Sequence, residues 1–301
     1  MFKTLKTYAI STLLLASVTV GAQAAEVTLK GASGLTLAAN LELADGKSVA
    51  DGVILFTHGT FSHNKHELVT TMQGLLAERG YSSLAPTLSL GVDMRKGPYD
   101  CAVPITHKHT DAMAEMGEWL NWLKGEGATS VAVMGHSRGG NQTAWFAARE
   151  DDPTITKVIL WAAQTWTMAD TAAGFKKRHG RDLAGAFTEA QALVDAGKGD
   201  QMMKGSGLLY CPGADVTAAS FADYYANDER MHTPKLLELI NKPVLVIAGT
   251  EDTVVPDLIE AVKPMADGVK VQLAVIEDSG HFFPEFYSED AADAIDEFMA
   301  Q

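Results

Sequence analysis

Short apolar runs alternate with amphipathic stretches along most of the chain, which is the pattern of a sheet whose strands are connected by helices. Such runs predict buried strands over residues 53–57, 81–85, 131–134, 158–162, 244–248 and 271–276, with Pro86 closing the second. Helices are predicted over residues 67–79, 111–123, 140–149 and 291–299. This alternation predicts an α/β fold with a mostly parallel sheet and helices on both faces.

Two parts of the chain depart from this alternation. Residues 26–30 and 35–43 flank a glycine-containing turn and predict an antiparallel hairpin at the start of the fold. Residues 164–239 contain helical stretches and glycine-rich joints, and no strand is predicted there. We interpret this segment as a cap inserted over one end of the sheet, with the core formed by residues 25–163 and 240–301.

The N-terminal residues carry a different pattern. Lys3 and Lys6 precede an apolar stretch over residues 9–21, and Ala22-Gln23-Ala24 fits the A-x-A cleavage site of secretory signal peptides. A membrane anchor is the alternative, but the apolar run is short for a span and ends in small residues. We therefore expect residues 1–24 to be a signal peptide cut after Ala24, a periplasmic or secreted bacterial protein, and no stable membrane insertion after cleavage.

Charge and cysteine content bear on the partners of the protein and on its disulfide state. The chain has 301 residues and a formal net charge of -14, with 38 acidic against 24 basic residues, which disfavours binding to a nucleic-acid backbone. Cys101 and Cys211 are the two cysteines. An oxidising compartment permits a disulfide between them, but two free thiols are equally compatible with the sequence. The sequence leaves the oligomeric state open.

Gly135-His136-Ser137-Arg138-Gly139 is the most informative motif. It fits G-x-S-x-G, the sharp turn that exposes a nucleophilic serine between a strand and a helix. The predicted strand before it and the predicted helix after it supply that context. Glycines beside the serine let the strand and the helix approach each other closely around a strained turn. Ser137 is therefore the candidate nucleophile.

A serine nucleophile needs a base, and the base needs a carboxylate that orients it. His281 follows the last predicted strand in Ser279-Gly280-His281 and is the candidate base. Asp252 follows the strand over 244–248 and is the candidate acid, with Glu251 as its direct competitor and Asp170 as a more distant one. The order serine, aspartate, histidine matches the template of the nucleophile turn.

An oxyanion needs hydrogen-bond donors that are already in place. One candidate is the backbone N–H of Arg138, and the other is that of Thr60, with Phe61 as the second choice, in the loop after the strand over 53–57. His58, at the start of that loop, is interpreted as a structural turn residue. The Arg138 side chain either meets an anionic substrate or, as is more common, turns away and pairs with an acid.

Several other side chains have weaker interpretations. Phe61, His136 and Phe282 are candidate substrate-binding residues beside the nucleophile and the base. His107 and His109, and likewise His63 and His66, have the spacing of metal ligands but lack clear partners elsewhere in the sequence. A loop or helix-cap role is favoured for these pairs, so no metal and no cofactor are predicted.

Together these motifs resemble those of the α/β-hydrolase superfamily. The residues that carry the resemblance are His58-Gly59-Thr60, Gly135 to Gly140, Gly249 to Asp252 and Gly280-His281. The resemblance implies an eight-stranded, mostly parallel sheet with a cap after its sixth strand. It also implies a Ser137–Asp252–His281 triad that forms an acyl-serine intermediate. The His-Gly-Gly-Gly loop of many lipases is absent, so the oxyanion loop is similar to that of small esterases.

The leading hypothesis is a serine hydrolase that acts on a small-molecule carboxylic ester or a related acyl substrate. A thioesterase, an amidase or peptidase and a perhydrolase-like enzyme use the same three side chains, and the sequence leaves them open. A binding protein that kept the fold and lost turnover is an alternative of another class. A metal-dependent hydrolase built on the histidine pairs is the third.

Overall fold

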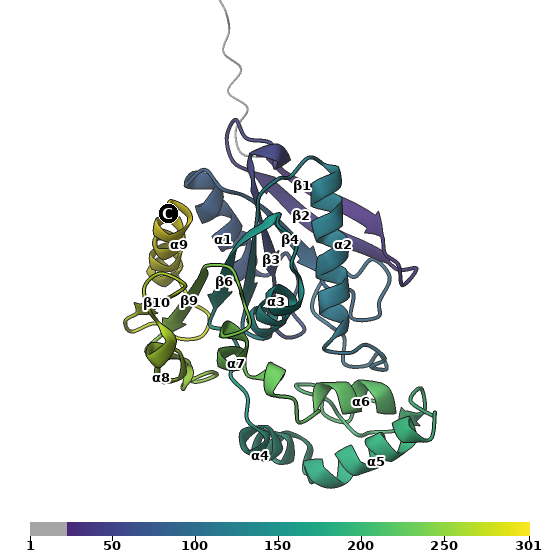
Figure 1. The fold of residues 1–301 in the computed structure, drawn as a ribbon. Coiled ribbons are helices and arrows are strands. Elements are labelled where there is room, and N and C mark those ends of the chain that lie inside the picture. Colours follow the sequence, from purple (N-terminus) through teal and green to yellow (C-terminus); the bar gives the residue numbers. More distant parts are fainter. Residues whose placement is uncertain (1–22) are drawn as a thin grey trace, which may run out of the picture.

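One mixed sheet of eight strands organises the described part of the chain, residues 23–301, in the computed structural model (Figure 1). The strands follow the order β1-β2-β4-β3-β5-β6-β9-β10, and β2 pairs antiparallel with both β1 and β4 while the other pairs are parallel. The bounds are β1 Gln23–Lys30, β2 Thr36–Leu43, β3 Val53–Thr57, β4 Ser82–Thr87, β5 Val131–His136, β6 Ile155–Trp161, β9 Val244–Gly249 and β10 Val271–Ile276. The predicted α/β fold with a mostly parallel eight-stranded sheet is confirmed.

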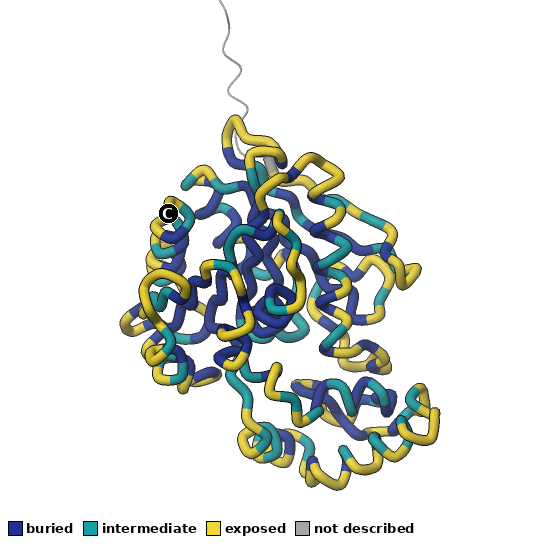
Figure 2. Tube along the Cα trace, viewed as in Figure 1, coloured by how far each residue is buried: buried dark blue, intermediate teal, exposed yellow. Residues whose placement is uncertain are grey.

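The central strands are buried along their whole length because helices cover both faces. Every residue of β3, β5 and β9 is buried, and Figure 2 shows these strands in dark blue at the centre of the molecule. Helices α1 and α9 pack against each other, as do α2 and α3 (Figure 1). The bounds are α1 Glu67–Glu78, α2 Asp111–Gly125, α3 Arg138–Arg149, α8 Leu258–Val262 and α9 Phe286–Met299, with 3-10 turns η1 Val49–Asp51 and η3 Lys263–Met265.

Two predicted boundaries near functional loops are wrong. Pro86 lies inside β4 instead of closing it. The pairing of β4 with β3 ends at Leu84, so Pro86, which lacks an N–H, interrupts no hydrogen bond between these two strands. Helix α3 begins at Arg138, two residues earlier than predicted, because Gly139 and Gly140 belong to its first turn.

Residues 164–239 lie between β6 and β9 and extend across one end of the sheet (Figure 1). They contain α4 Met168–His179, α5 Leu183–Asp195, α6 Ala218–Tyr224, η2 Glu229–Met231 and α7 Thr233–Leu237. They also contain β7 Met202–Met203 and β8 Val216–Thr217, which pair antiparallel and were not predicted because two residues show no alternation. The apolar cluster of this inserted segment includes Leu88 and Ile105 from the loop between β4 and α2.

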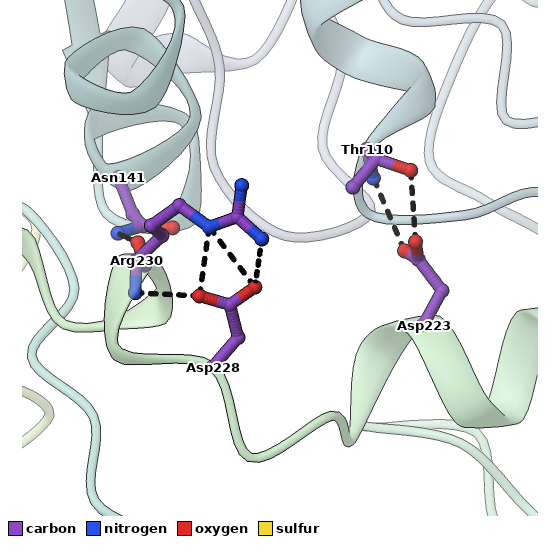
Figure 3. Close-up of polar contacts among 5 residues, drawn as sticks. All are labelled: Thr110, Asn141, Asp223, Asp228 and Arg230. Atoms are coloured by element: carbon purple, nitrogen blue, oxygen red, sulfur yellow. Dashed lines mark hydrogen bonds and ion pairs between the residues drawn. The ribbon is translucent and has the colours of Figure 1, made fainter. Parts of the chain in front are cut away.

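Polar contacts fix the inserted segment to the starts of α2 and α3 (Figure 3). The carboxylate of Asp223 accepts hydrogen bonds from the Thr110 backbone N–H, at 3.1 Å, and from the Thr110 hydroxyl, at 2.8 Å. The Asn141 amide donates to the backbone carbonyl of Arg230 at 3.0 Å, while the Arg230 guanidinium binds Asp228. These bonds hold the segment over the end of the sheet where β5 meets α3.

A disulfide between Cys101 and Cys211 is a further link between the β4–α2 loop and the inserted segment. The two Cα atoms are 5.2 Å apart, although the residues are 110 positions apart in sequence. A backbone bridge between Ile105 and Val216 lies in the same region. The alternative of two free thiols is therefore excluded in this structure.

We expect the double substitution Cys101→Ser and Cys211→Ser to lower the free energy of unfolding by about 2–4 kcal/mol. The bridge closes a long loop, and its loss enlarges the conformational freedom of the unfolded chain. Urea unfolding measures the change, and wild-type protein in dithiothreitol is the matched control. An unchanged unfolding midpoint in both samples would contradict a stabilising role for the bridge.

The predicted signal peptide falls almost wholly on residues 1–22, which lie outside the described residues. The expected cut after Ala24 would leave residues 25–30 of β1 in the sheet. Over residues 23–301, no helix combines the length and the apolar character needed to span a bilayer.

Candidate active site

Ser137 occupies a strained turn between β5 and α3. Its backbone angles are φ 57° and ψ -123°, a conformation that residues with a Cβ rarely adopt. The Ser137 N–H donates to the carbonyl of Trp161 in β6 at 2.9 Å, and the Ser137 carbonyl accepts from the N–H of Gln164 at 3.0 Å. The neighbouring strand thus fixes a turn that presents the serine side chain beyond the end of the sheet.

Three glycines around Ser137 allow backbone contacts that a side chain would block. A Cβ at Gly135 would lie 2.3 Å from the carbonyl oxygen of Gly139, and one at Gly139 would lie 2.3 Å from that of His58. A Cβ at Gly140 would lie 2.7 Å from the Cβ of Ala163. The sequence motif therefore has a steric cause, because the end of β3, the strand β5 and the start of α3 meet here.

We expect Gly139→Ala to lower the free energy of unfolding by about 1–3 kcal/mol, because the added methyl group overlaps a backbone carbonyl that cannot rotate away. Gly74→Ala is the matched control, since Gly74 lies inside α1 and a Cβ there would meet nothing within 4 Å. That control should leave stability unchanged or raise it by up to about 1 kcal/mol. Equal unfolding midpoints for the two variants would contradict this account.

The structure brings His281 and Asp252 to Ser137. The His281 Nε2 atom is 2.9 Å from the Ser137 Oγ, and the His281 Nδ1 atom is 2.8 Å from the Asp252 Oδ2. A carboxylate can only accept a hydrogen bond, so Nδ1 carries the proton and Nε2 is left to accept from the serine hydroxyl. Both His281 and Asp252 are buried, with 7% and 5% of their surfaces exposed.

The environment of Asp252 favours its ionised form. Burial raises the pKa of this carboxyl, but the hydrogen bond from His281 and the backbone N–H groups of Val255 and Val254 outweigh burial and bring the pKa below its usual value. The two backbone bonds to Asp252 Oδ1 measure 2.7 Å from Val254 and 3.0 Å from Val255. The charge is therefore held in one position beside the imidazole.

The two other candidates for the acid, Glu251 and Asp170, do not bind the His281 ring. Glu251 is exposed, although its backbone N–H donates to the carbonyl of Ser279 at 2.9 Å. Asp170 is exposed in the first turn of α4, where it accepts from the Thr167 hydroxyl. Of the three predicted candidates, only Asp252 contacts His281.

Close packing of two loops sets the distance between Asp252 and His281. A Cβ at Gly249, the last residue of β9, would lie 2.3 Å from the carbonyl oxygen of Ser279 in the loop after β10. The Asp278 N–H donates to the Thr250 hydroxyl at 2.9 Å, which joins the same two loops. Parallel neighbours β9 and β10 thus present their two loops side by side.

His136 contacts His281 from the other side. Its Nε2–H donates to the backbone carbonyl of His281 at 2.9 Å. Burial lowers the pKa of His136 to about 3, so the ring is neutral at ordinary pH. The sequence indicated a substrate-binding role from the place of His136 beside the nucleophile, but it gave no signal for this long-range bond.

The loop after β3 lies against Ser137. A Cβ at Gly59 would lie 3.3 Å from the Cβ of Ser137, so the loop and the serine are in close contact. Among residues 23–301, the backbone N–H groups of Thr60 and Arg138 donate no hydrogen bond. Two free donors next to the Ser137 hydroxyl are what an oxyanion site requires.

A buried pair, His58 and Arg95, fixes this loop. The His58 Nδ1–H donates to the carbonyl of Gly59 at 2.8 Å, and the Arg95 guanidinium donates to His58 Nε2 at 3.2 Å and to the carbonyl of Ser62 at 2.7 Å. Burial, together with the charge of Arg95, lowers the pKa of His58 to about 3. His58 is thus placed as a turn residue. Sequence reasoning missed Arg95 because His58 and Ser62, the partners that join it to this loop, are distant in sequence.

Two cavities meet at Ser137. The first, of about 420 Å³, is called the apolar lobe, and it is lined by Gly59, Thr60, Phe61, Ser62, His63, His66, Leu68, Val69, Pro98, His136, Ser137, Tyr210, Val254, His281 and Phe282. The second, of about 470 Å³, is called the polar lobe. It is lined by Thr60, Ser137, Arg138, Gln164, Thr165, Trp166, Thr167, Asp170, Thr171, Arg178, Leu209, Tyr210, Tyr224, Tyr225, Val254, Val255, Pro256 and Asp257. The predicted substrate-binding residues Phe61, His136 and Phe282 all line the apolar lobe.

The histidine pairs with metal-like spacing have other surroundings. His63 and His66 line the apolar lobe. His107 Nδ1 lies 2.9 Å from the Tyr224 hydroxyl, and burial lowers the pKa values of His107 and His109 to about 3. Within the described residues, no three or more His, Cys, Asp or Glu side chains converge as metal ligands would.

Comparison with known proteins adds an independent finding. The model of the "Alpha/beta hydrolase family" matches residues 54–297. Est1E from Butyrivibrio proteoclasticus superimposes with a TM-score of 0.61 at 19% identity, over 93% of this chain and 98% of that one. No curated protein sequence matches the chain.

Further solved structures share the fold at similarly low identity. An esterase from Pyrococcus furiosus superimposes with a TM-score of 0.59 at 16% identity, over 93% of this chain and 91% of that one. The alpha/beta hydrolase GrgF from a Penicillium species reaches 0.63 at 14% identity, over 92% of this chain and 97% of that one. At such identities the likeness establishes the fold alone.

Proposed function

Because the chain belongs to the alpha/beta hydrolase family, we propose that it is a serine hydrolase that cleaves carboxylic esters through an acyl-serine intermediate. The observation that carries the proposal is the continuous hydrogen-bonded series from Asp252 through His281 to Ser137, with distances of 2.8 and 2.9 Å. This is the geometry in which a base can take the proton of a nucleophile while a carboxylate holds the base.

The first half of the reaction follows from this geometry. His281 Nε2 accepts the hydroxyl proton as the Ser137 Oγ bonds to the ester carbonyl carbon. The negative charge that develops on the carbonyl oxygen is stabilised by the backbone N–H groups of Thr60 and Arg138. His281 then gives its proton to the leaving alcohol, and the acyl group remains on Ser137.

The second half repeats these steps with water. Water takes the place of the alcohol, loses a proton to His281 Nε2 and attacks the acyl carbon, and Ser137 recovers its proton as the acid leaves. Asp252 stays ionised throughout, since its pKa lies below the usual value, and it stabilises the imidazolium that forms in each half.

Two observations support an ester as the substrate. The cleft is open on both sides of Ser137, so a short alcohol and a short acid each have a cavity. Est1E, which shares the fold, has a structure with ferulic acid bound, at 18% identity over 91% of this chain. That neighbour supports a carboxylic acid or its ester as the ligand type here.

Labelling with a fluorophosphonate probe tests the proposal. The folded protein is expected to gain one covalent adduct on Ser137, as read by peptide mass spectrometry, and to lose turnover of p-nitrophenyl acetate and butyrate. Ser33→Ala is the matched control, because Ser33 is exposed in the β1–β2 turn, and it should label as the wild type does. A folded, active protein with no adduct on Ser137 would rule out the proposal.

A further inference from the structure

Charged side chains line the polar lobe and not the apolar one, and Arg138 is the charged residue next to Ser137. Its guanidinium is half-buried in the polar lobe, where Nε donates to the Thr60 hydroxyl at 3.2 Å and Nη1 donates to His109 Nδ1 at 3.3 Å. The Tyr224 ring centroid lies 5.7 Å from its Cζ. Within the described chain, no carboxylate lies within 4 Å of Arg138.

A cation in this position needs a counter-charge. Removing a guanidinium from water is costly unless an anion or several acceptors compensate it, and among the described residues Arg138 has only two acceptors, both neutral. Burial lowers the pKa of Arg138, and the charge of Arg178 acts in the same direction. The pairing with an acid that sequence reasoning considered more common is therefore absent from the described structure.

Arg178 is a second cation in the polar lobe. It belongs to α4, and its Cζ lies 5.3 Å from the centroid of the Tyr210 ring. It has no carboxylate within 4 Å among residues 23–301, whereas nearby Arg181 contacts Glu189 at 3.7 Å. Among residues 23–301, the core thus contributes a half-buried arginine and the inserted segment an exposed one to the same cavity, and neither has an ion-pair partner.

The polar lobe also has two carboxylates, and both lie at its exposed edge. Asp170 accepts from the Thr167 hydroxyl, and Asp257 accepts from the Thr165 hydroxyl. Both aspartates are exposed, while Arg138 is half-buried beside Ser137. The two arginines therefore suit a ligand group with one negative charge. The two aspartates at the edge would repel a group with two negative charges.

The position of His281 assigns the two halves of the substrate to the two lobes. His281 lines the apolar lobe and does not line the polar one. The leaving alcohol must take its proton from His281 Nε2, so it lies on the side of the apolar lobe. The acyl group that remains on Ser137 then extends into the polar lobe, toward Arg138.

We propose that the polar lobe binds a carboxylate at the far end of the acyl group, so that the substrates are monoesters of dicarboxylic acids. Arg138 and Arg178 bind the carboxylate, and the apolar lobe holds the alcohol. This inference rests on the proposed ester hydrolysis at Ser137 and adds the chemical class of the acid.

Three butyl esters of equal acyl length test the inference, with acid release measured in a pH-stat. Monobutyl glutarate ends in a carboxylate, butyl pentanoate ends in a methyl group, and butyl 4-aminobutanoate ends in an ammonium. We expect kcat/KM for the glutarate to exceed that for the pentanoate by about 10- to 100-fold, because charge-assisted hydrogen bonds replace an unpaired cation. The ammonium ester is expected to be the slowest of the three.

Variants identify the residues responsible. Arg138→Gln and Arg178→Gln should each lower the ratio of glutarate to pentanoate activity by about tenfold or more, with Arg138 giving the larger change. The ratio within each variant is the readout, because the Arg138 side chain also contacts Thr60 and its loss affects the neutral ester as well. Arg181→Gln is the matched control and should keep the wild-type ratio, because Arg181 does not line the lobe.

The outcomes separate the two proposals. Hydrolysis of the pentanoate with no preference for the glutarate overturns the dicarboxylate inference and leaves ester hydrolysis intact. A preference that survives in both arginine variants, or a preference for the ammonium ester, also overturns it. Failure to hydrolyse any of the three esters, together with no fluorophosphonate adduct on Ser137, overturns ester hydrolysis and the inference with it.

Discussion

Ser137→Ala is expected to lower kcat for ester hydrolysis by about 10⁵- to 10⁶-fold, close to the limit of detection. The variant has no atom that can bond to the carbonyl carbon, and the remaining binding groups and oxyanion donors supply only a small residual rate. Steady-state hydrolysis of p-nitrophenyl butyrate measures the change. The fold should survive, because an alanine removes only the hydroxyl that contacts His281.

Thermal unfolding of the same samples is the control for Ser137→Ala. The melting temperature should stay within a few degrees of the wild type, and Ser33→Ala should retain full activity. Activity of Ser137→Ala within tenfold of the wild type would place the chemistry on another residue.

Asp252→Asn should lower kcat by about 10⁴-fold, the second largest effect. An amide does not carry the negative charge that stabilises the imidazolium, and its N–H₂ group favours the wrong tautomer of His281. Asp252 touches no substrate, so KM should change little while kcat falls. Progress curves at saturating and limiting p-nitrophenyl butyrate separate the two parameters.

Glu251→Gln is the matched control for Asp252→Asn. Glu251 is adjacent in sequence and was the direct competitor for the role, but it is exposed and does not contact His281. Its substitution should change kcat by less than twofold. A large loss in Glu251→Gln with little loss in Asp252→Asn would reverse the assignment.

The parts of the site that could be predicted from the sequence are those encoded locally. Ser137 lies in a glycine-rich turn between a strand and a helix, and Asp252 and His281 each follow a short apolar run directly. Because parallel strands end at the same edge of a sheet, locating each strand end was enough to bring these three residues to one place. The distances between these three side chains came only from the structure.

The parts that were missed depend on contacts between distant segments. The bond from His136 to the His281 carbonyl, and the position of Arg95 beneath the loop of Thr60, join residues far apart in sequence. No periodicity or motif encodes such pairs. The disulfide is of the same kind, since the packing of the β4–α2 loop against the inserted segment brings Cys101 to Cys211.

The Arg138 side chain shows the limit of local reasoning most clearly. The sequence places a cation next to Ser137 but does not say whether an acidic side chain contacts that cation. The tertiary structure answers this question, because the inserted segment contributes Tyr224 and Arg178, and no acidic side chain, to the immediate surroundings of Arg138 in the described structure. The signal peptide and the exported location, by contrast, stay predictions from the first 24 residues.

The most direct test of the central claim is the mass of the protein during turnover. Acid quenching within milliseconds of mixing with p-nitrophenyl butyrate, followed by peptide mass spectrometry, should show a butyryl group on the peptide that contains Ser137. Continued turnover with no acyl group on that peptide, or with the group on another residue, would contradict the account.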